Sequence, residues 1–375
     1  MIPLLLGATV PAMLVCWAAA LAVRRFGPPL GLVDRPGERK IHGRAMPTAG
    51  GLAIWAGVVV PLALGQLVLW WLGNNPQVEL PAFVAPHVSG LWQQSGKLWL
   101  LLGGGTVLML LGLADDRWGL DWRMRLAVQA AVAAVLVLVQ PQWRVTLFVD
   151  APLLTGALSV VWIVGLVNSI NMLDNMDGLA AGVAAIAAAM LAGVMLLAGD
   201  PATCRPQLFV AGLLLVVVGS LIGFLWHNRP PARLFMGDAG SYLVGYLLAM
   251  ATLSATFAGY DAEFPRHAIL APLCALAVPL YDTTSVVLIR LRAGRSPFVG
   301  DTSHFSHRLV SLGMTKTQAV LTIYLATATC GLGALLLHQV DTAGACVVVL
   351  LVVCILVLIA ILEAAGRRKP PGKLE

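Results

Sequence analysis

The chain has 375 residues, of which 59% are hydrophobic and 11% are charged, and its mean hydropathy is +0.86. A soluble globular domain carries about 25% charged residues, so this composition excludes an ordinary soluble fold and indicates an integral membrane protein. The net charge of +6 and the basic cluster at 367–369 suit an anionic lipid surface. Because no compact basic domain is present, nucleic acid is not expected as a partner.

Apolar runs follow one another along the whole chain. An α-helix needs about 20 apolar residues to cross the hydrocarbon core. The first run lacks a basic start and a small-residue cleavage site, so we interpret it as a retained anchor rather than a cleaved signal. The sequence therefore predicts an all-α fold, a single domain over 1–375 built as a polytopic bundle of about eleven spans. The predicted spans are 1–23, 49–72, 97–114, 125–140, 151–170, 178–198, 207–226, 238–258, 267–289, 318–337 and 343–364.

The basic residues predict the orientation of these spans. Twenty of the 24 Lys and Arg residues lie in the odd-numbered connections and the C-terminal tail, and four lie on the other side. Basic residues stay on the cytoplasmic side of a membrane. We therefore expect the N-terminus outside and the C-terminus in the cytoplasm.

The unusual polar segments all fall on the predicted cytoplasmic side. One connection reads GLADDRWGL, with Asp115 and Asp116 at a helix end, and another ends in FMGDAGSYLVGY, in which Asp238 opens the next predicted span. Neighbouring carboxylates at a membrane rim repel one another unless a cation or a phosphate-binding group compensates them. A DD pair alone could equally cap a helix end. The small residues of FMGDAGSYLVGY also suit close helix packing, although that does not explain Asp238.

The segment NSINMLDNMDGLAAG, residues 168–182, carries a second polar group. Asn168, Asn171 and Asp174 are spaced by three and share one face of a helix end, where unpartnered polar side chains are costly. Asp177 could instead be the N-cap of the next helix.

The last large cytoplasmic connection contains His304, His307 and Arg308 in the segment HFSHRL. A histidine pair at this spacing can bind zinc, but no Cys or third His lies nearby to complete such a site. Carboxylate and amide oxygens select magnesium, which usually binds through one or two carboxylates together with substrate phosphate. Taken together, the polar segments predict phosphoryl transfer, which depends on positioning and charge neutralisation.

These motifs, in this order, resemble the polyprenyl-phosphate N-acetylhexosamine-1-phosphate transferases (glycosyltransferase family 4). The resemblance covers residues from about 34 to 318 and leaves two C-terminal spans and a basic tail in 319–375. It implies transfer of a sugar 1-phosphate from a UDP-HexNAc to undecaprenyl or another polyprenyl phosphate, with release of UMP and with Mg²⁺, or Mn²⁺ in its place, as cofactor. It also implies a multi-pass protein of the bacterial inner membrane with a cytoplasmic active site, which could form a homodimer.

The same resemblance assigns roles to residues at matching positions. It implies Asp115, Asp116 and Asp174 as catalytic acids, with the DD pair at the lipid-phosphate end. Asn171 and Asp238 are the implied metal ligands. Asn228 and Phe235 match a nucleotide-binding segment in which the aromatic ring can stack on uracil. The implied substrate contacts are Lys40, Asn168, Asp177, Asn228, Phe235, His304, His307 and Arg308.

Two positions depart from the family pattern. Asn175 stands where the family usually has Gly, and Ser306 replaces a histidine of the motif usually written HxHH. The first loop, which contains RKIH and MPTAGG, is more similar to the GlcNAc-1-phosphate transferase branch than to the phospho-MurNAc-pentapeptide translocase branch. GlcNAc is therefore the expected sugar, GalNAc, QuiNAc and FucNAc are left open, and the translocase-type activity is the alternative.

Two other classes of protein compete with this interpretation. Intramembrane acids also mark ion pathways in secondary transporters, but transporter sites lie near the bilayer midplane and these acids lie at helix ends. The other competitor is a membrane scaffold without activity, which would have no need to retain five aspartates at one membrane face. The motifs leave open whether transfer proceeds in one step or through an aspartyl intermediate.

Overall fold

The computed structural model describes residues 2–34, 46–81, 84–145, 148, 150–200, 203, 205–257, 265–298 and 303–366. Lys40, an expected substrate contact, lies outside the described residues, as do most of the basic tail and Asp301. The described chain is α-helical apart from a ladder of two residues per strand, in which β1 (Val33–Asp34) pairs antiparallel with β2 (Met46–Pro47). The predicted all-α fold class is confirmed.

Each apolar run forms a helix, because a helix satisfies all of its backbone groups internally in an apolar environment. The long helices are α1 (Ile2–Phe26), α2 (Gly50–Asn74), α3 (Ala85–Trp118), α4 (Trp122–Val139), α5 (Pro152–Leu173), α6 (Leu179–Leu197), α7 (Leu208–Asn228), α8 (Gly237–Ser254), α10 (Ala277–Arg292), α12 (Lys316–Leu336) and α13 (Thr342–Gly366). The short helices are η1 (Pro28–Leu30), η2 (Pro141–Trp143), η3 (Arg266–Leu270), α9 (Ala271–Ala275) and α11 (Phe305–Ser311).

The described residues contain fewer helices of spanning length and hydropathy than the eleven spans predicted from the sequence. Among the described residues, nine helices are long and apolar enough to cross a membrane, and a tenth span arises if η3–α9 and α10, which meet at a bend of 68°, are counted together. The segment predicted to span at 267–289 is helical but is broken at Leu276, so it crosses a membrane only if the bent pair is counted as one span. The remaining predicted span, at 238–258, is α8, which is a helix but not one of the nine.

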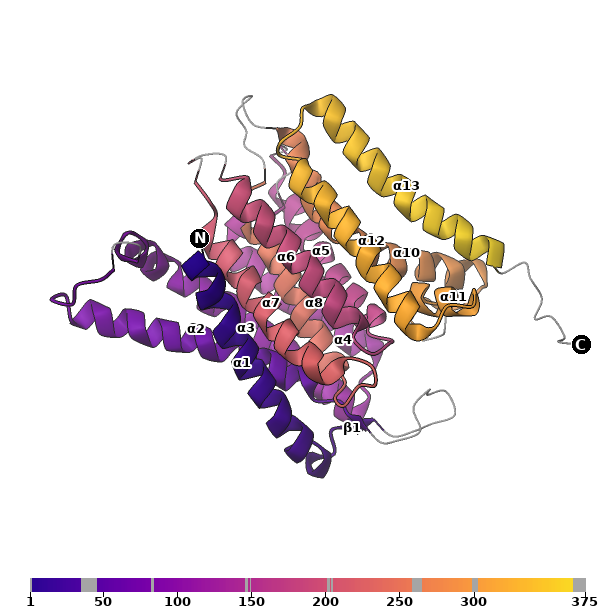
Figure 1. The fold of residues 1–375 in the computed structure, drawn as a ribbon, viewed down its shortest axis with the longest axis horizontal. Coiled ribbons are helices and arrows are strands. Elements are labelled where there is room, and N and C mark those ends of the chain that lie inside the picture. The colour runs from indigo at the N-terminus through magenta and orange to yellow at the C-terminus, as the bar shows by residue number, and fades with distance from the viewer. Residues whose placement is uncertain are drawn as a thin grey trace, which may run out of the picture.

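Helix α8 lies in the middle of the bundle, between α3 and α5 (Figure 1). Its side chains from Ala239 to Leu253 are all buried. Because protein rather than lipid surrounds it, α8 can carry Gly, Ser, Tyr and Asp, which explains its lower hydropathy. Close packing depends on its small residues: a Cβ at Gly245 would lie 2.6 Å from the carbonyl oxygen of Leu166 in α5.

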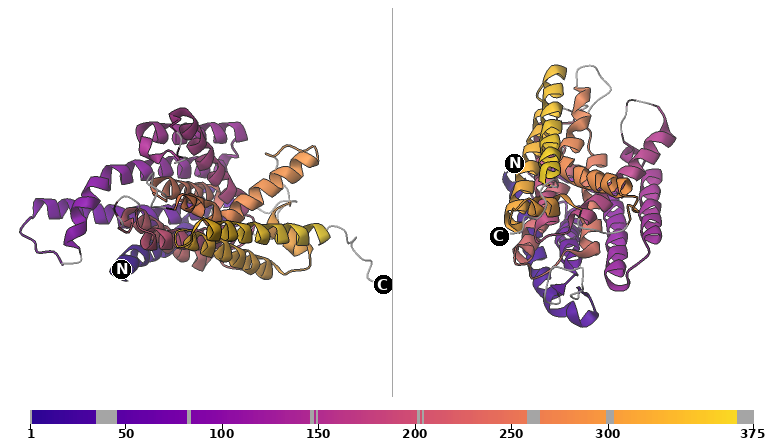
Figure 2. Two further views of the ribbon diagram at one scale, coloured as in Figure 1. Left: turned by 90° about the horizontal axis from the view of Figure 1, so that it is seen from above. Right: turned by 90° about the vertical axis from the view of Figure 1, so that its right-hand side faces the viewer.

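The outer helices expose apolar side chains. In Figure 1, α13 runs along the outside of α12, and α2 together with the start of α3 extends away from the bundle, as Figure 2 also shows. Along α2, Leu64, Leu67, Val68, Trp70 and Trp71 are all exposed. Exposed apolar surface of this extent is typical of helices that face lipid. Helix α3 begins at Ala85, twelve residues before the predicted run, so much of the expected loop 73–96 is helical.

Candidate active site

The acidic residues of the predicted cytoplasmic side come together where α3 ends and α8 begins. Asp116 in α3 accepts hydrogen bonds from the backbone amides of Asp238, at 2.9 Å, and Ala239, at 3.2 Å. Its carboxylate therefore caps a helix that starts more than a hundred residues later in the chain, where the free amides and the helix dipole favour an anion. The capping role that the sequence allowed for the DD pair is real, but the capped helix is α8.

Asp115 is buried and has several partners. It accepts hydrogen bonds from the backbone amide of Leu120 at 2.8 Å and from the hydroxyl of Tyr242 at 3.0 Å. It also forms an ion pair with Arg125 in α4, at 2.5 Å between Nη1 and Oδ2. Because the same guanidinium lies 3.9 Å from Oδ2 of Asp238, Arg125 links two acids that the sequence separates widely.

Sequence reasoning did not identify Arg125 or Tyr242 as site residues. Arg125 counted only as a basic residue that indicated topology, and Tyr242 lay inside a predicted span. The one available signal was that Arg125 is on the first turns of the helix that directly follows the DD pair. That helix, α4, begins at an N-cap formed by Asp121, whose side chain accepts the amide of Arg123 at 2.8 Å.

Asn171 in α5 faces the start of α8, as the spacing of its motif predicts. Its amide nitrogen donates to Oδ1 of Asp238 at 2.6 Å and to the hydroxyl of Ser241 at 3.0 Å. Gly112 lets α3 pack closely against the start of α8. A Cβ at Gly112 would clash with the backbone carbonyl of Asp238. The carboxylate of Asp238 remains 31% exposed, whereas that of Asp115 is 4% exposed.

Asp174 ends α5 beside the same group. Burial, Asp238 and Asp177 raise its pKa to about 7, because each disfavours the charged carboxylate. Asp174 also interacts electrostatically with Asp116. We call Asp115, Asp116, Asp174, Asp177 and Asp238 the acidic cluster. The spatial convergence expected from the motifs is therefore present, and it concentrates negative charge.

Asp177 does not cap α6, so that alternative is wrong. The N-cap of α6 is Gly178, with a φ of 76° and no side-chain cap. Asp177 instead accepts the backbone amide of Ala232 at 3.0 Å. Asn228 completes the connection, because its oxygen accepts the amide of Gly178 at 2.9 Å and its nitrogen donates to the carbonyl of Leu234 at 2.9 Å. Both residues thus hold loop 174–178 against loop 229–236.

Phe235 lies in this second loop, directly before α8. Its backbone amide donates to the carbonyl of Pro47 at 2.9 Å, and its carbonyl accepts the amide of Gly50 at 3.0 Å. These bonds join residues 46–51, which follow the connection between α1 and α2, to the start of α8. The side chain of Phe235 is half-buried at this position.

Asn168 is one turn away from Asn171 but does not reach the acidic cluster. Its amide nitrogen donates to the side-chain oxygen of Gln129 in α4, at 2.6 Å, and to the carbonyl of Val164 at 2.8 Å. Gln129 is fully buried. Asn168 therefore joins α4 to α5, and the structure does not bring it together with the other predicted substrate contacts.

The histidines form a second group, which we call the histidine segment, residues 303–311. Nδ1 of His304 lies 3.0 Å from Oδ2 of Asp282, and the amide of Phe305 donates to the other oxygen of Asp282 at 2.6 Å. His307 is half-buried, and burial together with His304 lowers its pKa. Asp282 is a further residue that sequence reasoning missed.

Arg308 of the histidine segment is buried and is paired inside the protein. Its Nε lies 3.2 Å from Oε2 of Glu363 in α13, and its Nη2 donates to the hydroxyl of Ser285 at 2.8 Å. The hydroxyl of Tyr281 donates to the same oxygen of Glu363 at 2.9 Å. Glu363 lay within the last predicted span, so nothing in the sequence pointed to it as a partner of Arg308.

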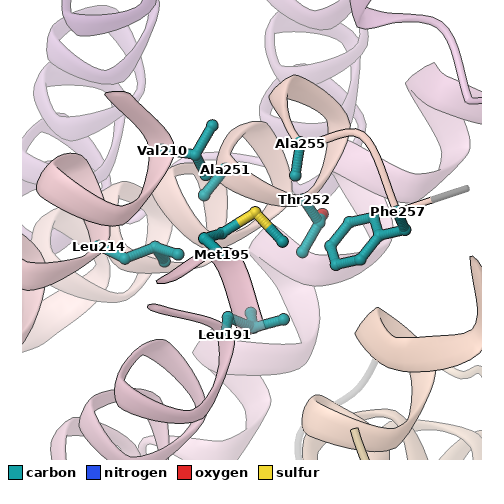
Figure 3. Close-up of a pocket in the computed structure, with 8 residues that line it drawn as sticks. All are labelled: Leu191, Met195, Val210, Leu214, Ala251, Thr252, Ala255 and Phe257. Carbon is teal, nitrogen blue, oxygen red and sulfur yellow. The ribbon is translucent and has the colours of Figure 1, made fainter. Parts of the chain in front are cut away.

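A small pocket elsewhere in the bundle is not a substrate site. It lies between the far ends of α6, α7 and α8. Its lining is apolar apart from Thr252 (Figure 3), whose hydroxyl is engaged by Trp162 and Ala249. Along α8, Thr252 is about 20 Å from Asp238 at 1.5 Å per residue. The charged chemistry is confined to the other end of these helices.

The donor atoms of the acidic cluster suit a hard divalent cation. Within the described ranges, no three His, Cys, Asp or Glu side chains are close enough to hold a metal ion without other ligands. Mg²⁺ characteristically binds through one or two carboxylates and completes its shell with substrate phosphate and water. Asp238, which is partly exposed, and Asn171 beside it offer such an incomplete set of oxygen ligands.

Comparison with known proteins agrees with this arrangement. Residues 98–256 match the model of the glycosyl transferase family 4. The decaprenyl-phosphate N-acetylglucosaminephosphotransferase of Mycolicibacterium smegmatis is 32% identical over 96% of this chain and 87% of its own length. The probable undecaprenyl-phosphate N-acetylglucosaminyl 1-phosphate transferase of Bacillus subtilis is 30% identical over 81% of this chain and 76% of its own length.

A third relative, the undecaprenyl-phosphate alpha-N-acetylglucosaminyl 1-phosphate transferase of Escherichia coli, is 28% identical over 81% of this chain and 76% of its own length. The range matched by the family model, 98–256, includes the DD pair, the segment 168–182 and the start of α8. The chain therefore belongs to glycosyl transferase family 4, the family of the polyprenyl-phosphate N-acetylglucosamine-1-phosphate transferases.

Proposed function

We propose that the protein transfers GlcNAc 1-phosphate from UDP-GlcNAc to a polyprenyl phosphate, undecaprenyl phosphate in the first instance, and releases UMP. The observation that carries this proposal is the meeting of α3, α5 and α8 at one end of the bundle. Asp116 caps α8, Asn171 bonds to Asp238, and Asp174 ends α5 beside them. The names of the family relatives supply the sugar and the lipid.

A divalent cation, Mg²⁺ or Mn²⁺, is part of the proposal, with Asp238 and Asn171 as its ligands. When bound, such a cation neutralises charge on the donor diphosphate. The acidic cluster needs this compensation, because burial and like charges raise the pKa of Asp174 to about 7. Arg125 supplies part of it, as its guanidinium lies between Asp115 and Asp238.

The positions of Asp115 and Asp116 favour direct attack by the lipid phosphate. Both carboxylates are occupied by hydrogen bonds, and Asp115 is also paired with Arg125. In the proposed step an oxygen of the polyprenyl phosphate forms a bond to the sugar-linked phosphorus. The bond from that phosphorus to the bridging oxygen breaks, and UMP leaves with the electron pair. No base is required, since a phosphate monoester with a second pKa near 6 is mostly dianionic at neutral pH.

The site belongs, in this proposal, at the cytoplasmic face of a bacterial inner membrane, with eleven spans. The nine apolar helices, the bent pair η3–α9–α10 and α8 account for that number. Twenty of the 24 basic residues lie in the connections and tail on the side of the acidic cluster. A UDP-sugar is made in the cytoplasm and is too highly charged to cross the membrane, so the donor must reach the protein from that side.

Turnover by the purified protein tests the proposal. Radiolabelled UDP-GlcNAc is incubated with undecaprenyl phosphate and Mg²⁺ in detergent, and label in the lipid phase and released UMP are measured, with EDTA as the metal-free arm. We expect equal amounts of lipid-linked label and UMP, and neither in EDTA. The protein is also reconstituted in proteoliposomes for a transport assay. Label that enters these proteoliposomes without UMP release would indicate a transporter, and the absence of both label uptake and UMP release would indicate a scaffold.

The donor is tested in the same assay. UDP-GlcNAc is compared with UDP-GalNAc and with UDP-MurNAc-pentapeptide under identical conditions. We expect UDP-GlcNAc to give the highest kcat/KM. A preference for the pentapeptide donor would replace the proposed activity with a translocase-type activity.

A further inference from the structure

The two positions at which this chain departs from the family pattern contact each other. The hydroxyl of Ser306 in α11 donates a hydrogen bond to Oδ1 of Asn175 at 2.5 Å, across 131 positions of sequence. The amide nitrogen of Asn175 donates to the carbonyl of Met172, at the end of α5, at 3.0 Å. Asn175 therefore uses both ends of its side chain, and it joins the histidine segment to the loop that carries Asp174.

Ser306 is not available to a substrate. Its side chain is fully buried, as is that of Phe305 before it, and Arg308 two positions later in α11 is also buried. Its hydrogen-bonding capacity is directed to Asn175. A residue at position 306 consequently acts through the orientation of α11, which carries His307 on the next position, rather than by touching the donor.

The backbone does not explain why Asn175 is present. Its φ is not in the left-handed region, in contrast to Gly178, where φ is 76°. Position 175 therefore accepts either Gly or a larger residue on conformational grounds. What distinguishes Asn from Gly here is the side chain, which fills space against α11 and accepts the hydrogen bond of Ser306.

We infer that Asn175 and Ser306 are a matched positioning pair, in which a large residue at 175 and a small one at 306 replace the family's Gly and His. The pair fixes the first turn of α11, and with it His304 and His307, relative to Asp174. This inference rests on the proposed function for its kinetic readout. Because position 306 is fully buried, an imidazole there requires the space that the Asn175 amide occupies, and Gly at 175 vacates that space.

The inference predicts reciprocal dependence in a double-mutant cycle of N175G, S306H and the double variant, assayed as UDP-GlcNAc turnover. N175G removes the side-chain hydrogen bonds to Ser306 and Met172; the bond to Ser306, worth about 0.5–1.5 kcal/mol, corresponds to a 2- to 13-fold lower kcat/KM, which is the smallest loss we expect. S306H overpacks a buried site and should lose about 10- to 100-fold. In the double variant the imidazole enters the vacated space, and kcat/KM should return to within about 3-fold of wild type.

S306A keeps the test valid if S306H does not fold. It removes only the hydroxyl, so we expect KM for UDP-GlcNAc to rise about 2- to 10-fold with kcat within 2-fold. S306T, which keeps a hydroxyl, should recover part of this loss. S311A is the matched control, since Ser311 is exposed on the same helix and bonds only within it, to the carbonyl of Arg308. It should match wild type in every measurement.

Thermal unfolding of the same variants separates this inference from the proposed function. If wild type shows no transferase activity, the proposed function fails, while the cycle measured by unfolding still reports whether 175 and 306 are coupled. Additive losses in the double variant would overturn the matched pair. Coupled melting temperatures with an unchanged KM in S306A would overturn the positioning role and leave a structural contact.

Discussion

The acidic cluster and the histidine segment lie next to each other but differ in how their charged side chains are paired. In the histidine segment His304 and Arg308 each contact a buried carboxylate, Asp282 and Glu363 respectively. In the acidic cluster Arg125 pairs with Asp115 and lies near Asp238, whereas Asp116 and Asp177 accept hydrogen bonds from backbone amides. Side chains that are paired with one another need no bound ion. Neighbouring carboxylates, in contrast, repel one another unless a cation binds among them. This difference supports the proposed placement of the metal in the acidic cluster and a proposed positioning role for the histidine segment.

The largest effect is expected at Asp238, the partly exposed acid that accepts a hydrogen bond from Asn171. D238N keeps the size of the side chain but removes the charge that would hold a cation. We expect kcat/KM to fall by about 10²–10³-fold at limiting Mg²⁺, with part of the loss recovered at high Mg²⁺. UMP release measured over a magnesium series checks this.

D341N is the matched control for Asp238. Asp341 is an exposed carboxylate at the start of α13 that accepts the amide of Gly344 at 2.8 Å. Asn caps helices about as well as Asp, so activity and stability should not change. Full activity of D238N at limiting Mg²⁺ would remove Asp238 from the metal site.

The next largest effect is expected at Arg125. R125A leaves Asp115 buried without its ion pair, and breaking a buried pair costs about 3–5 kcal/mol. We expect a clearly lower melting temperature together with a loss of about 10- to 100-fold in kcat/KM. R125K keeps the charge without the planar fork and should be intermediate. If R125A equalled wild type in both measurements, the charge balance described for the acidic cluster would be incorrect.

A smaller effect is expected at Glu363, because it acts through Arg308. E363Q removes the ion pair and retains an acceptor for the hydroxyl of Tyr281. We expect KM for UDP-GlcNAc to rise about 3- to 10-fold with little change in kcat or in the dependence on Mg²⁺. A changed magnesium dependence in E363Q would contradict the separation of the two regions.

The smallest effect is expected at Asn168, and it contrasts with Asn171 one turn away. N168L loses the bond to Gln129 but no contact with the acidic cluster, so kcat/KM should stay within about 3-fold while the melting temperature falls by a few degrees. N171L removes the contact with Asp238 and should lose more than about 30-fold. Equal losses in the two variants would return Asn168 to the set of substrate contacts.

The location of the site could be predicted because it depends on local patterns. Asp116, Asp174 and Asp238 each end or begin an apolar run, and alternate connections share one side of a membrane. Their convergence follows from those two facts. The partners could not be predicted, since they depend on which helices are neighbours. Arg125 counted as a topology signal, and Asp177 suited a cap of α6 although it bonds to Ala232.

The amino-acid sequence alone therefore determined the helical bundle, the family and the end of the bundle that carries the chemistry, because hydropathy, basic residues and motif order are properties of the linear chain. The tertiary structure alone decided which groups pair. Glu363 meets Arg308, and Ser306 meets Asn175, only because α13 and α11 pack beside α10 and the end of α5. Hydrogen bonds act over about 3 Å, and no pattern along a sequence specifies separations of that size between distant helices.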